Sequence, residues 1–239
     1  MRLLLIRHGQ TPDNVIGALG TTAPGARLTD LGLRQAAALP AALAAETIGA
    51  LFVSTLVRTQ LTAAPLAAAR GLEPVVLDGL REVVAGDLEM RADREAGAAY
   101  MGTVARWVVG DRDARMPGAE SGHEFLARYD AAIERATADG HDTVAVVSHG
   151  AAVRGWVGCR VAGAGGTFVR DHDLSNTGVV VVEGSRADGF RLVSWEGTPL
   201  GGSELDDPTA DDPTGEAPAD VVADSDRAGA ERADAAARP

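Results

Sequence analysis

Thr143-Val144-Ala145-Val146-Val147-Ser148-His149-Gly150 carries the clearest fold signal in this chain. Its four successive small or β-branched apolar residues predict a strand that is buried on both faces, as strands of parallel sheets usually are. The start of the chain has the same form and reads Arg2-Leu3-Leu4-Leu5-Ile6-Arg7-His8-Gly9. In both stretches an apolar run gives way to a histidine and a glycine, which is the end of a strand where α/β proteins hold their ligands.

Strand-like and helix-like segments alternate between and beyond these two runs. Further strands are predicted at 50–53, 74–77, 178–183 and 190–195. Helices are predicted at 29–46, 56–69, 91–109, 121–138 and 151–161. This alternation predicts an α/β fold, a three-layer sandwich whose mostly parallel sheet carries helices on both faces.

The composition argues against several classes of protein. The formal net charge is −12, so no binding of nucleic acid is expected. All 22 basic residues are arginine, and a chain without lysine forms neither a lysine Schiff base nor a Walker-type phosphate loop. The single cysteine, Cys159, cannot build a disulfide framework or a Cys-rich zinc site.

The apolar runs are short compared with those of membrane or exported proteins. A membrane helix needs roughly 20 apolar residues, and the run at the start of the chain is also too short for the core of a signal peptide. We therefore expect a cytoplasmic protein without membrane contact. We further expect either a monomer or a homodimer.

The charge divides the chain into a body and a tail. Residues 204–239 hold 11 acidic residues against three arginines and carry no aromatic residue. Such a segment buries too little apolar surface to offset the entropy of ordering, so 204–239 is predicted to be an acidic disordered tail. The tail is interpreted as a solubilising segment or as an electrostatic arm. Residues 1–200 are expected to form the catalytic domain.

Basic and imidazole side chains follow three of the predicted strands. Arg7 and His8 follow the first strand, Arg58 follows the second, and His149 follows the strand at 143–147. Arginine forms forked, charge-assisted hydrogen bonds to phosphate, and a neutral imidazole is a nucleophile at neutral pH. Phosphoryl transfer needs mainly positioning and charge stabilisation, which these side chains supply without a metal or another cofactor.

The leaving oxygen in such a reaction needs a proton, and a carboxylic acid is its expected source. Glu82 comes within five residues of the predicted strand at 74–77 and is the first candidate. Asp87, Glu89 and Glu120 are the alternatives.

Five short blocks resemble the histidine phosphatase superfamily, the phosphoglycerate-mutase-like enzymes, over about residues 1–195. In chain order they are Leu5-Ile6-Arg7-His8-Gly9-Gln10-Thr11, the run 54–63 from Ser54 to Ala63, Leu80-Arg81-Glu82, the run 117–121 from Pro117 to Ser121, and Val147-Ser148-His149-Gly150. The resemblance implies that His8 is the nucleophile and forms a phosphohistidine. It implies that Arg7, Arg58 and His149 hold the phosphoryl group and that Glu82 protonates the leaving oxygen and then activates water.

The resemblance further implies that Thr11, Asn14 and Gly150 contact the phosphate or the substrate. Asn176 is interpreted as a brace for the site or as a turn asparagine. The segment at about 86–120 is expected to cap the pocket. Five arginines in or near this segment are available for a second anionic group or are solvated helix residues, namely Arg91, Arg94, Arg106, Arg112 and Arg115.

Departures from the mutase branch favour a phosphatase. The mutase branch reads Glu-Arg-His-Tyr-Gly at the acid, whereas this chain reads Glu82-Val83-Val84-Ala85-Gly86, and it uses a lysine that this chain lacks. We therefore expect a metal-independent phosphomonoesterase for a small phosphorylated substrate, with a pH optimum at or somewhat below 7. The alternatives are a cofactor-dependent phosphoglycerate mutase and a non-catalytic phosphate-binding regulatory module.

Overall fold

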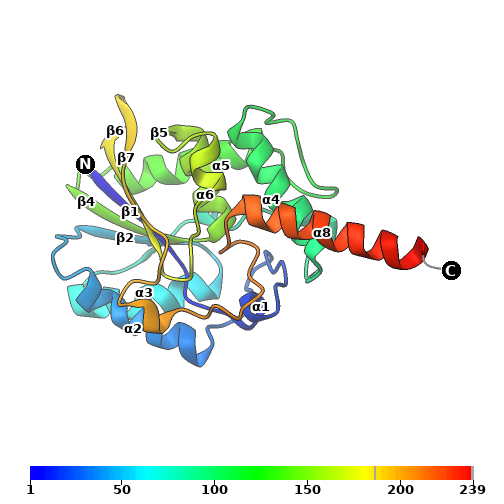
Figure 1. The fold of residues 1–239 in the computed structure, drawn as a ribbon. Helices are drawn as coiled ribbons and strands as arrows, with labels where there is room; N and C mark the ends of the chain where they lie inside the picture. The colour runs from blue at the N-terminus through cyan, green and yellow to red at the C-terminus, as the bar shows by residue number, and fades with distance from the viewer. Residues whose placement is uncertain (186, 238–239) are drawn as a thin grey trace.

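The structure, a computed structural model, describes residues 1–185 and 187–237, with side chains described as far as residue 227. A seven-stranded sheet forms its centre, with helices on both faces (Figure 1). The strand order is β3-β2-β4-β1-β6-β7-β5. The strands are β1 (Arg2–Arg7), β2 (Ala50–Val53), β3 (Val75–Val76), β4 (Thr143–Ser148), β5 (Val161–Ala162), β6 (Val179–Ser185) and β7 (Gly189–Glu196).

The half of the sheet that carries the sequence motifs is parallel. β1 pairs with β4 in parallel, β4 with β2, and β2 with β3. β6 runs antiparallel to β1 and β7 antiparallel to β6, so the sheet is mixed at its other half. The carboxyl ends of β1, β2 and β4 therefore meet at one edge of the sheet.

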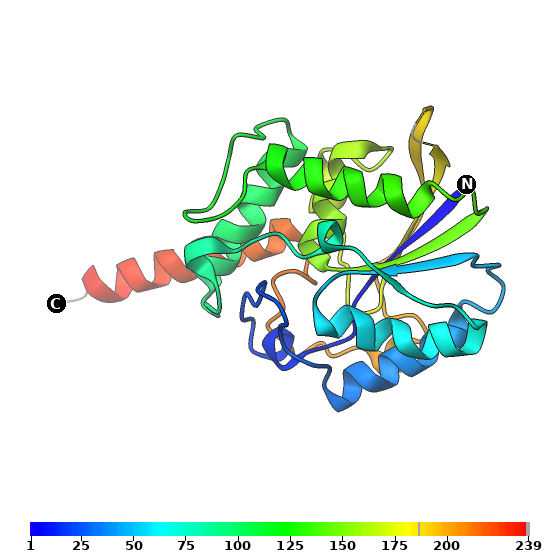
Figure 2. The ribbon, with the colours of Figure 1, turned by 180° about the vertical axis from the view of Figure 1, so that it is seen from behind.

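Two helical layers cover the sheet (Figures 1 and 2). The helices α2 and α3 lie on one face, and α4, α5 and α6 lie on the other. The main helices are α1 (Pro12–Val15), α2 (Asp30–Ala42), α3 (Val57–Arg70), α4 (Arg94–Val108), α5 (Gly122–Thr137), α6 (Gly150–Arg160), α7 (Thr167–Arg170) and α8 (Pro218–Ala237). Three short 3₁₀ turns complete the elements, η1 (Asp78–Leu80), η2 (Gly86–Leu88) and η3 (Ser203–Leu205).

Alternation along β1 explains why the sheet is buried on both sides. Leu3 and Leu5 join the core beneath α4, α5 and α6, whereas Leu4 and Ile6 join the core beneath α2 and α3. β4 divides its side chains in the same way, which is the arrangement that its continuous apolar run predicted. The predicted α/β three-layer fold with a mostly parallel sheet is therefore confirmed.

Single elements differ from their predicted bounds. The strand predicted at 74–77 consists of Val75 and Val76, because β3 lies at the edge of the sheet and pairs with β2 at these two positions. The helix predicted at 91–109 is α4, which begins after the N-cap Asp93 and ends at Val108. In the part of the chain that the structure describes, no helix combines the length and the apolarity that crossing a membrane requires.

The prediction that 204–239 is disordered is wrong for the described part of this segment. Residues 206–217 run along the body, where Asp212 is buried and forms an ion pair with Arg7. Helix α8 follows, packs at its start against α4, and Val221 enters the main core. The tail has little apolar surface of its own, but buried arginines of the body bind its acids and carbonyls, and the composition of the tail does not reveal these partners. Residues 238–239 of the predicted tail lie outside the described residues.

Candidate active site

The two histidines emerge side by side because β1 and β4 pair in register. Arg7 and Ser148 are the last residues of their strands and lie opposite each other in the parallel ladder. His8 and His149 each follow directly after them. Their ring centroids lie 5.2 Å apart with an angle of 62° between the planes. Both rings are buried. The sequence therefore correctly predicted that these two imidazoles share one edge of the sheet.

The hydrogen bonds of His8 determine which ring nitrogen carries the proton. Nδ1 lies 2.8 Å from the carbonyl oxygen of Gly9, and because a carbonyl only accepts, Nδ1 is the donor. Nε2 consequently holds a lone pair, and it accepts a hydrogen bond from Nε of Arg58 at 3.0 Å. Burial lowers the pKa of His8 well below its usual 6.5, and the charges of Arg58 and Arg7 lower it further. The ring is thus held neutral, with Nε2 as its nucleophilic atom.

His149 is anchored by a hydroxyl group at the end of β2. Its Nε2 lies 2.7 Å from Oγ of Ser54. Burial is the main cause that lowers the pKa of His149 well below 6.5, followed by the charge of Arg58. Because Nε2 contacts Ser54, Nδ1 is the ring atom left to meet a ligand.

Both predicted phosphate-binding arginines are buried beside His8. Arg58, from the first turn of α3, also donates from Nη2 to the carbonyl oxygen of Gly20 at 3.0 Å. Arg7 donates from Nη1 to the carbonyl oxygen of Leu174 at 2.8 Å. Its Nη2 pairs with the carboxylate of Asp212.

Four buried side-chain nitrogens lack a hydrogen-bond partner within the described part of the chain: Nε of Arg7, Nη1 of Arg58, Nε of Arg112 and Nδ1 of His149. The first, second and fourth belong to residues that the sequence assigned to phosphate. A buried donor without a partner costs about 1–3 kcal/mol, so it is retained where a ligand completes it. These three nitrogens belong to residues that adjoin His8 in sequence, donate to its ring or pack against it, so they are available to an anion that binds there.

Glu82 is buried in the same cavity, opposite the N-terminus of α6. Its carboxylate accepts backbone N–H groups of Val83 at 2.9 Å, Ala152 at 2.8 Å and Ala151 at 3.3 Å. Burial raises the pKa of Glu82, and this effect outweighs the opposing hydrogen bonds and the charge of Arg58. A raised pKa is what a proton donor at neutral pH needs.

The alternative acids do not line this cavity. Glu89 accepts the N–H groups of Thr21 and Thr22 at 2.8 and 2.9 Å, and these bonds, together with one from the Thr21 hydroxyl, keep its pKa low despite burial. Glu120 forms a short ion pair with Arg128 at 2.5 Å. Asp87 likewise lies outside the lining.

The cavity around His8 also contains Thr11 and Asn14. These two residues form a reciprocal cap on α1, in which the backbone N–H and the hydroxyl of Thr11 both donate to Oδ1 of Asn14 at 2.9 Å. Asn176 donates from Nδ2 to the carbonyl oxygen of His8 at 3.1 Å, which is the interaction of a brace. Gly150 is the first residue of α6, next to His149.

The segment 86–120 lines the cavity with a single described residue, Tyr100. None of the five arginines considered for a second anionic group lines it. Three of them are bound to neighbouring acids, Arg91 to Asp93, Arg106 to Asp111 and Arg115 to Glu124. More of the lining comes from the C-terminal segment, through Asp212, Pro213 and Thr214, which the sequence did not associate with the site.

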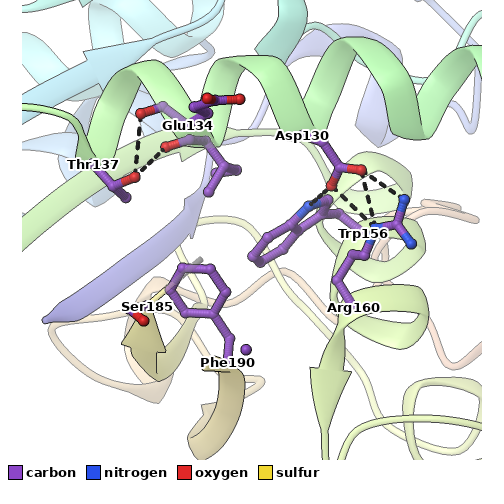
Figure 3. A pocket seen from close by; sticks show the side chains of 9 residues that line it. Asp130, Glu134, Thr137, Trp156, Arg160, Ser185 and Phe190 are labelled. Atoms are coloured by element: carbon purple, nitrogen blue, oxygen red, sulfur yellow. Dashed lines mark hydrogen bonds and ion pairs between the residues drawn. The ribbon is translucent and has the colours of Figure 1, made fainter. Parts of the chain in front are cut away.

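A larger cavity of about 230 Å³ lies elsewhere, between α5, α6 and the β6–β7 hairpin (Figure 3). Trp156 and Phe190 form its apolar walls. Polar groups at its rim already bind one another, because Asp130 accepts a hydrogen bond from Nε1 of Trp156 at 2.9 Å and pairs with Arg160. The cavity therefore offers volume without the reactive groups that surround His8.

The described residues contain no group of three or more His, Cys, Asp or Glu side chains placed to hold a metal ion.

Comparison with known proteins places these observations in a family. Residues 3–198 match the family described as the histidine phosphatase superfamily, branch 1. The chain is 36% identical over 216 residues, 84% of its length, to the PE-PGRS family protein PE_PGRS11 of Mycobacterium tuberculosis, and spans 37% of that protein. It is 31% identical over 150 residues, 62% of its length, to the adenosylcobalamin/α-ribazole phosphatase of Salmonella typhimurium, and spans 74% of that protein.

The fold is shared with solved structures. A mycobacterial glucosyl-3-phosphoglycerate phosphatase in complex with VO3 superposes with a TM-score of 0.69 at 24% identity, covering 82% of this chain and 98% of that chain. At this level of identity the likeness concerns the fold.

Proposed function

This chain belongs to the histidine phosphatase superfamily, and from that premise we propose that it is a metal-independent phosphomonoesterase that works through a phosphohistidine on His8. Its relatives include proteins described as phosphatases, which supports a phosphatase activity in general terms. The observation that carries the finer proposal is that Arg7, Arg58 and His149, the neighbours of His8, each keep a buried nitrogen without a partner among the described residues, while Nε2 of His8 holds a lone pair.

The proposed reaction has two displacements at phosphorus. Nε2 of His8 attacks the phosphorus, the bond to the leaving oxygen breaks, and that oxygen takes the proton of Glu82. The charge on the remaining phosphoryl oxygens is stabilised by Arg7, Arg58 and His149. The Glu82 carboxylate then takes a proton from water, and the resulting hydroxide attacks phosphorus. The nitrogen–phosphorus bond breaks, which gives phosphate and neutral His8.

One hydrogen bond must change before the attack. Nε of Arg58 donates to the lone pair on Nε2 of His8 at 3.0 Å, and that same lone pair forms the bond to phosphorus. A bound phosphate oxygen is a stronger acceptor than an imidazole, because a charged acceptor makes hydrogen bonds roughly twice as strong. We infer that the phosphate draws the guanidinium of Arg58 onto itself and frees the nucleophile.

The substrate is proposed to be a small phosphomonoester, with no nucleic acid and no membrane as partner. Burial lowers the pKa of His8 and raises that of Glu82, and both directions support the expected optimum at or somewhat below pH 7. The cytoplasmic location remains a prediction of the sequence.

The test is hydrolysis of an aryl phosphate by the full chain in excess EDTA, compared with His8→Ala. We expect EDTA to leave the rate unchanged and His8→Ala to abolish it. Rapid acid-free quenching of the wild type with labelled substrate should trap label on His8. Loss of activity in EDTA would contradict the metal-independent chemistry, and hydrolysis surviving in His8→Ala would contradict the phosphohistidine.

A further inference from the structure

The C-terminal segment 207–216, the strap, lies across the proposed phosphate site. Asp212 pairs with Nη2 of Arg7, and Oγ1 of Thr214 accepts from the same nitrogen at 2.8 Å. Upstream, Asp207 accepts Nε2 of Gln10 at 2.8 Å, close to the loop that carries His8. The strap therefore contacts Arg7 at its downstream end and the loop after His8 at its upstream end.

The strap sits in close contact with the backbone beneath it. A Cβ atom at Gly150 would overlap the carbonyl oxygen of Thr214, and one at Gly17 would overlap that of Asp211. Two positions that lack a side chain thus allow the strap to approach the start of α6 and the end of α1. The strap is therefore packed closely against the body.

One buried arginine anchors the downstream end of the strap. Arg154 donates to the carbonyl oxygens of Thr214 at 3.3 Å, Gly215 at 2.8 Å and Glu216 at 3.1 Å. The backbone of Gly215 also accepts the N–H of Leu174 at 2.7 Å. The segment 214–216 is therefore fixed to the body, and the part of the strap that can yield is 207–213.

The closed strap leaves little room for a substrate. The cavity that holds His8, Arg58 and Glu82 measures about 20 Å³, enough for about one water molecule. Asp212 and Pro213 form part of its wall. A phosphomonoester needs more room than this beside His8, and the strap forms one wall of the cavity.

The group that the strap places on Arg7 is chemically similar to a phosphate. Arginine binds carboxylate and phosphate oxygens with the same forked donors. Nη2 of Arg7 is occupied by Asp212, while Nε of Arg7 has no partner among the described residues. A phosphate bound at Nε would also lie beside the negative charge of Asp212, which repels it.

We propose that Asp212 is an internal competitor of the substrate phosphate for Arg7, and that the strap 207–213 is displaced when a phosphate binds. The inference rests on the proposed function in taking Arg7 as a phosphate ligand. In the free protein the strap supplies a single carboxylate, and a phosphate dianion replaces it because it also satisfies the unpartnered nitrogens of Arg58 and His149. The strap consequently weakens the binding of every phosphate ligand.

The test is the affinity of the full-length protein for inorganic phosphate, measured by isothermal titration calorimetry. Asp212→Asn keeps the shape and an acceptor for Arg7 but removes the charge, so we expect it to bind phosphate on the order of 10-fold more tightly than the wild type. The matched control is Asp211→Asn, which removes the same charge from the exposed neighbouring residue and should leave the affinity unchanged.

A second measurement requires no variant. Hydrogen exchange of the peptide covering 207–213 in the wild type should become faster when inorganic phosphate is added, because the strap leaves its cradle. Slower exchange would overturn the proposal, because the strap would then close over the ligand instead of competing with it.

The outcomes separate the strap from the proposed function. Phosphate binding that is equal or weaker in Asp212→Asn overturns the competition while leaving a phosphohistidine mechanism intact, and a weaker value would make Asp212 a positioning residue for Arg7. Absence of phosphate binding to the wild type and to Asp212→Asn, with no hydrolysis of aryl phosphate, would overturn both.

Discussion

Glu82 differs from its alternatives in what surrounds its carboxyl group. It is buried in the cavity of His8 with a raised pKa, whereas Glu89 serves as an acceptor for the turn at Thr21 with a lowered one. We expect Glu82→Gln to lower kcat/KM for an alkyl phosphate roughly 10²–10⁴-fold. For p-nitrophenyl phosphate, whose leaving group needs no proton, the loss should be smaller. Steady-state kinetics on both substrates measures the difference.

The pH profile provides the control. Wild-type activity should decline on the alkaline side as Glu82 loses its proton, and this decline should disappear in Glu82→Gln. Glu89→Gln should keep the profile and most of the activity, with a lower Tm because the turn at Thr21 loses the negative charge and one of its two acceptor oxygens. An equal loss of activity in both variants would contradict the assignment of the acid.

Residue by residue, the sequence identified the side chains that follow strands. His8, Arg58 and His149 could be placed together because parallel strands end at one edge. Ser54 stood in the quoted motif without a role, and its contact with His149 depends on the register of β2 against β4. Asp212 could not be found, because a residue 205 positions from Arg7 in an acidic tail carries no local signal of contact.

At the scale of elements, α5 holds the loop that carries Glu82. Arg128 on α5 donates to the carbonyl oxygens of Gly79 at 2.8 Å, Arg81 at 2.9 Å and Glu82 at 2.9 Å, and it pairs with Glu120. Three carbonyls of one turn thus converge on one largely buried guanidinium. We interpret Arg128 as the positioning residue for the proposed acid.

Arg128→Gln should therefore impair chemistry more than binding. We expect a loss of unfolding free energy of about 3 kcal/mol, because Glu120 is left without its partner. We also expect kcat for an alkyl phosphate to fall while KM changes little, with a smaller fall for p-nitrophenyl phosphate. Arg135→Gln, which breaks the exposed pair of the same helix with Asp139, is the control. An equal fall of kcat on both substrates would contradict a role through Glu82.

Elements with a hydrophobic period were predictable, and those held by polar contacts were not. β4 and α5 follow from apolar spacing, and α5 begins with a capping box formed by Ser121 and Glu124. The strap has no such period, and its order depends on carbonyls and carboxylates that Arg7 and Arg154 bind. The sequence pattern of one segment does not show which distant residues that segment contacts, so the order of the strap was not predictable.

For the whole molecule, the site imposes a dependence of stability on pH. His8 and His149 are buried, and their pKa values lie well below 6.5 in the folded protein. The unfolded chain binds protons at these residues near pH 6.5, so the folded state loses stability as the pH falls below that value. Glu82 acts in the opposite direction, because its raised pKa favours proton uptake by the folded state. Asp13 in the same cavity acts as Glu82 does, but both carboxyl pKa values rise from ordinary values of 3.8 and 4.5, so the two imidazoles dominate near pH 6.5 and the net effect there is destabilisation by acid.

The free energy of unfolding should thus fall between pH 7.5 and 5.5, with each histidine contributing up to about 1.4 kcal/mol per pH unit below 6.5. Urea titrations at several pH values measure this slope. His8→Gln removes one buried imidazole and should reduce the slope. If His8→Gln kept the full slope, the neutral buried state of His8, and with it the availability of its lone pair for phosphorus, would be contradicted.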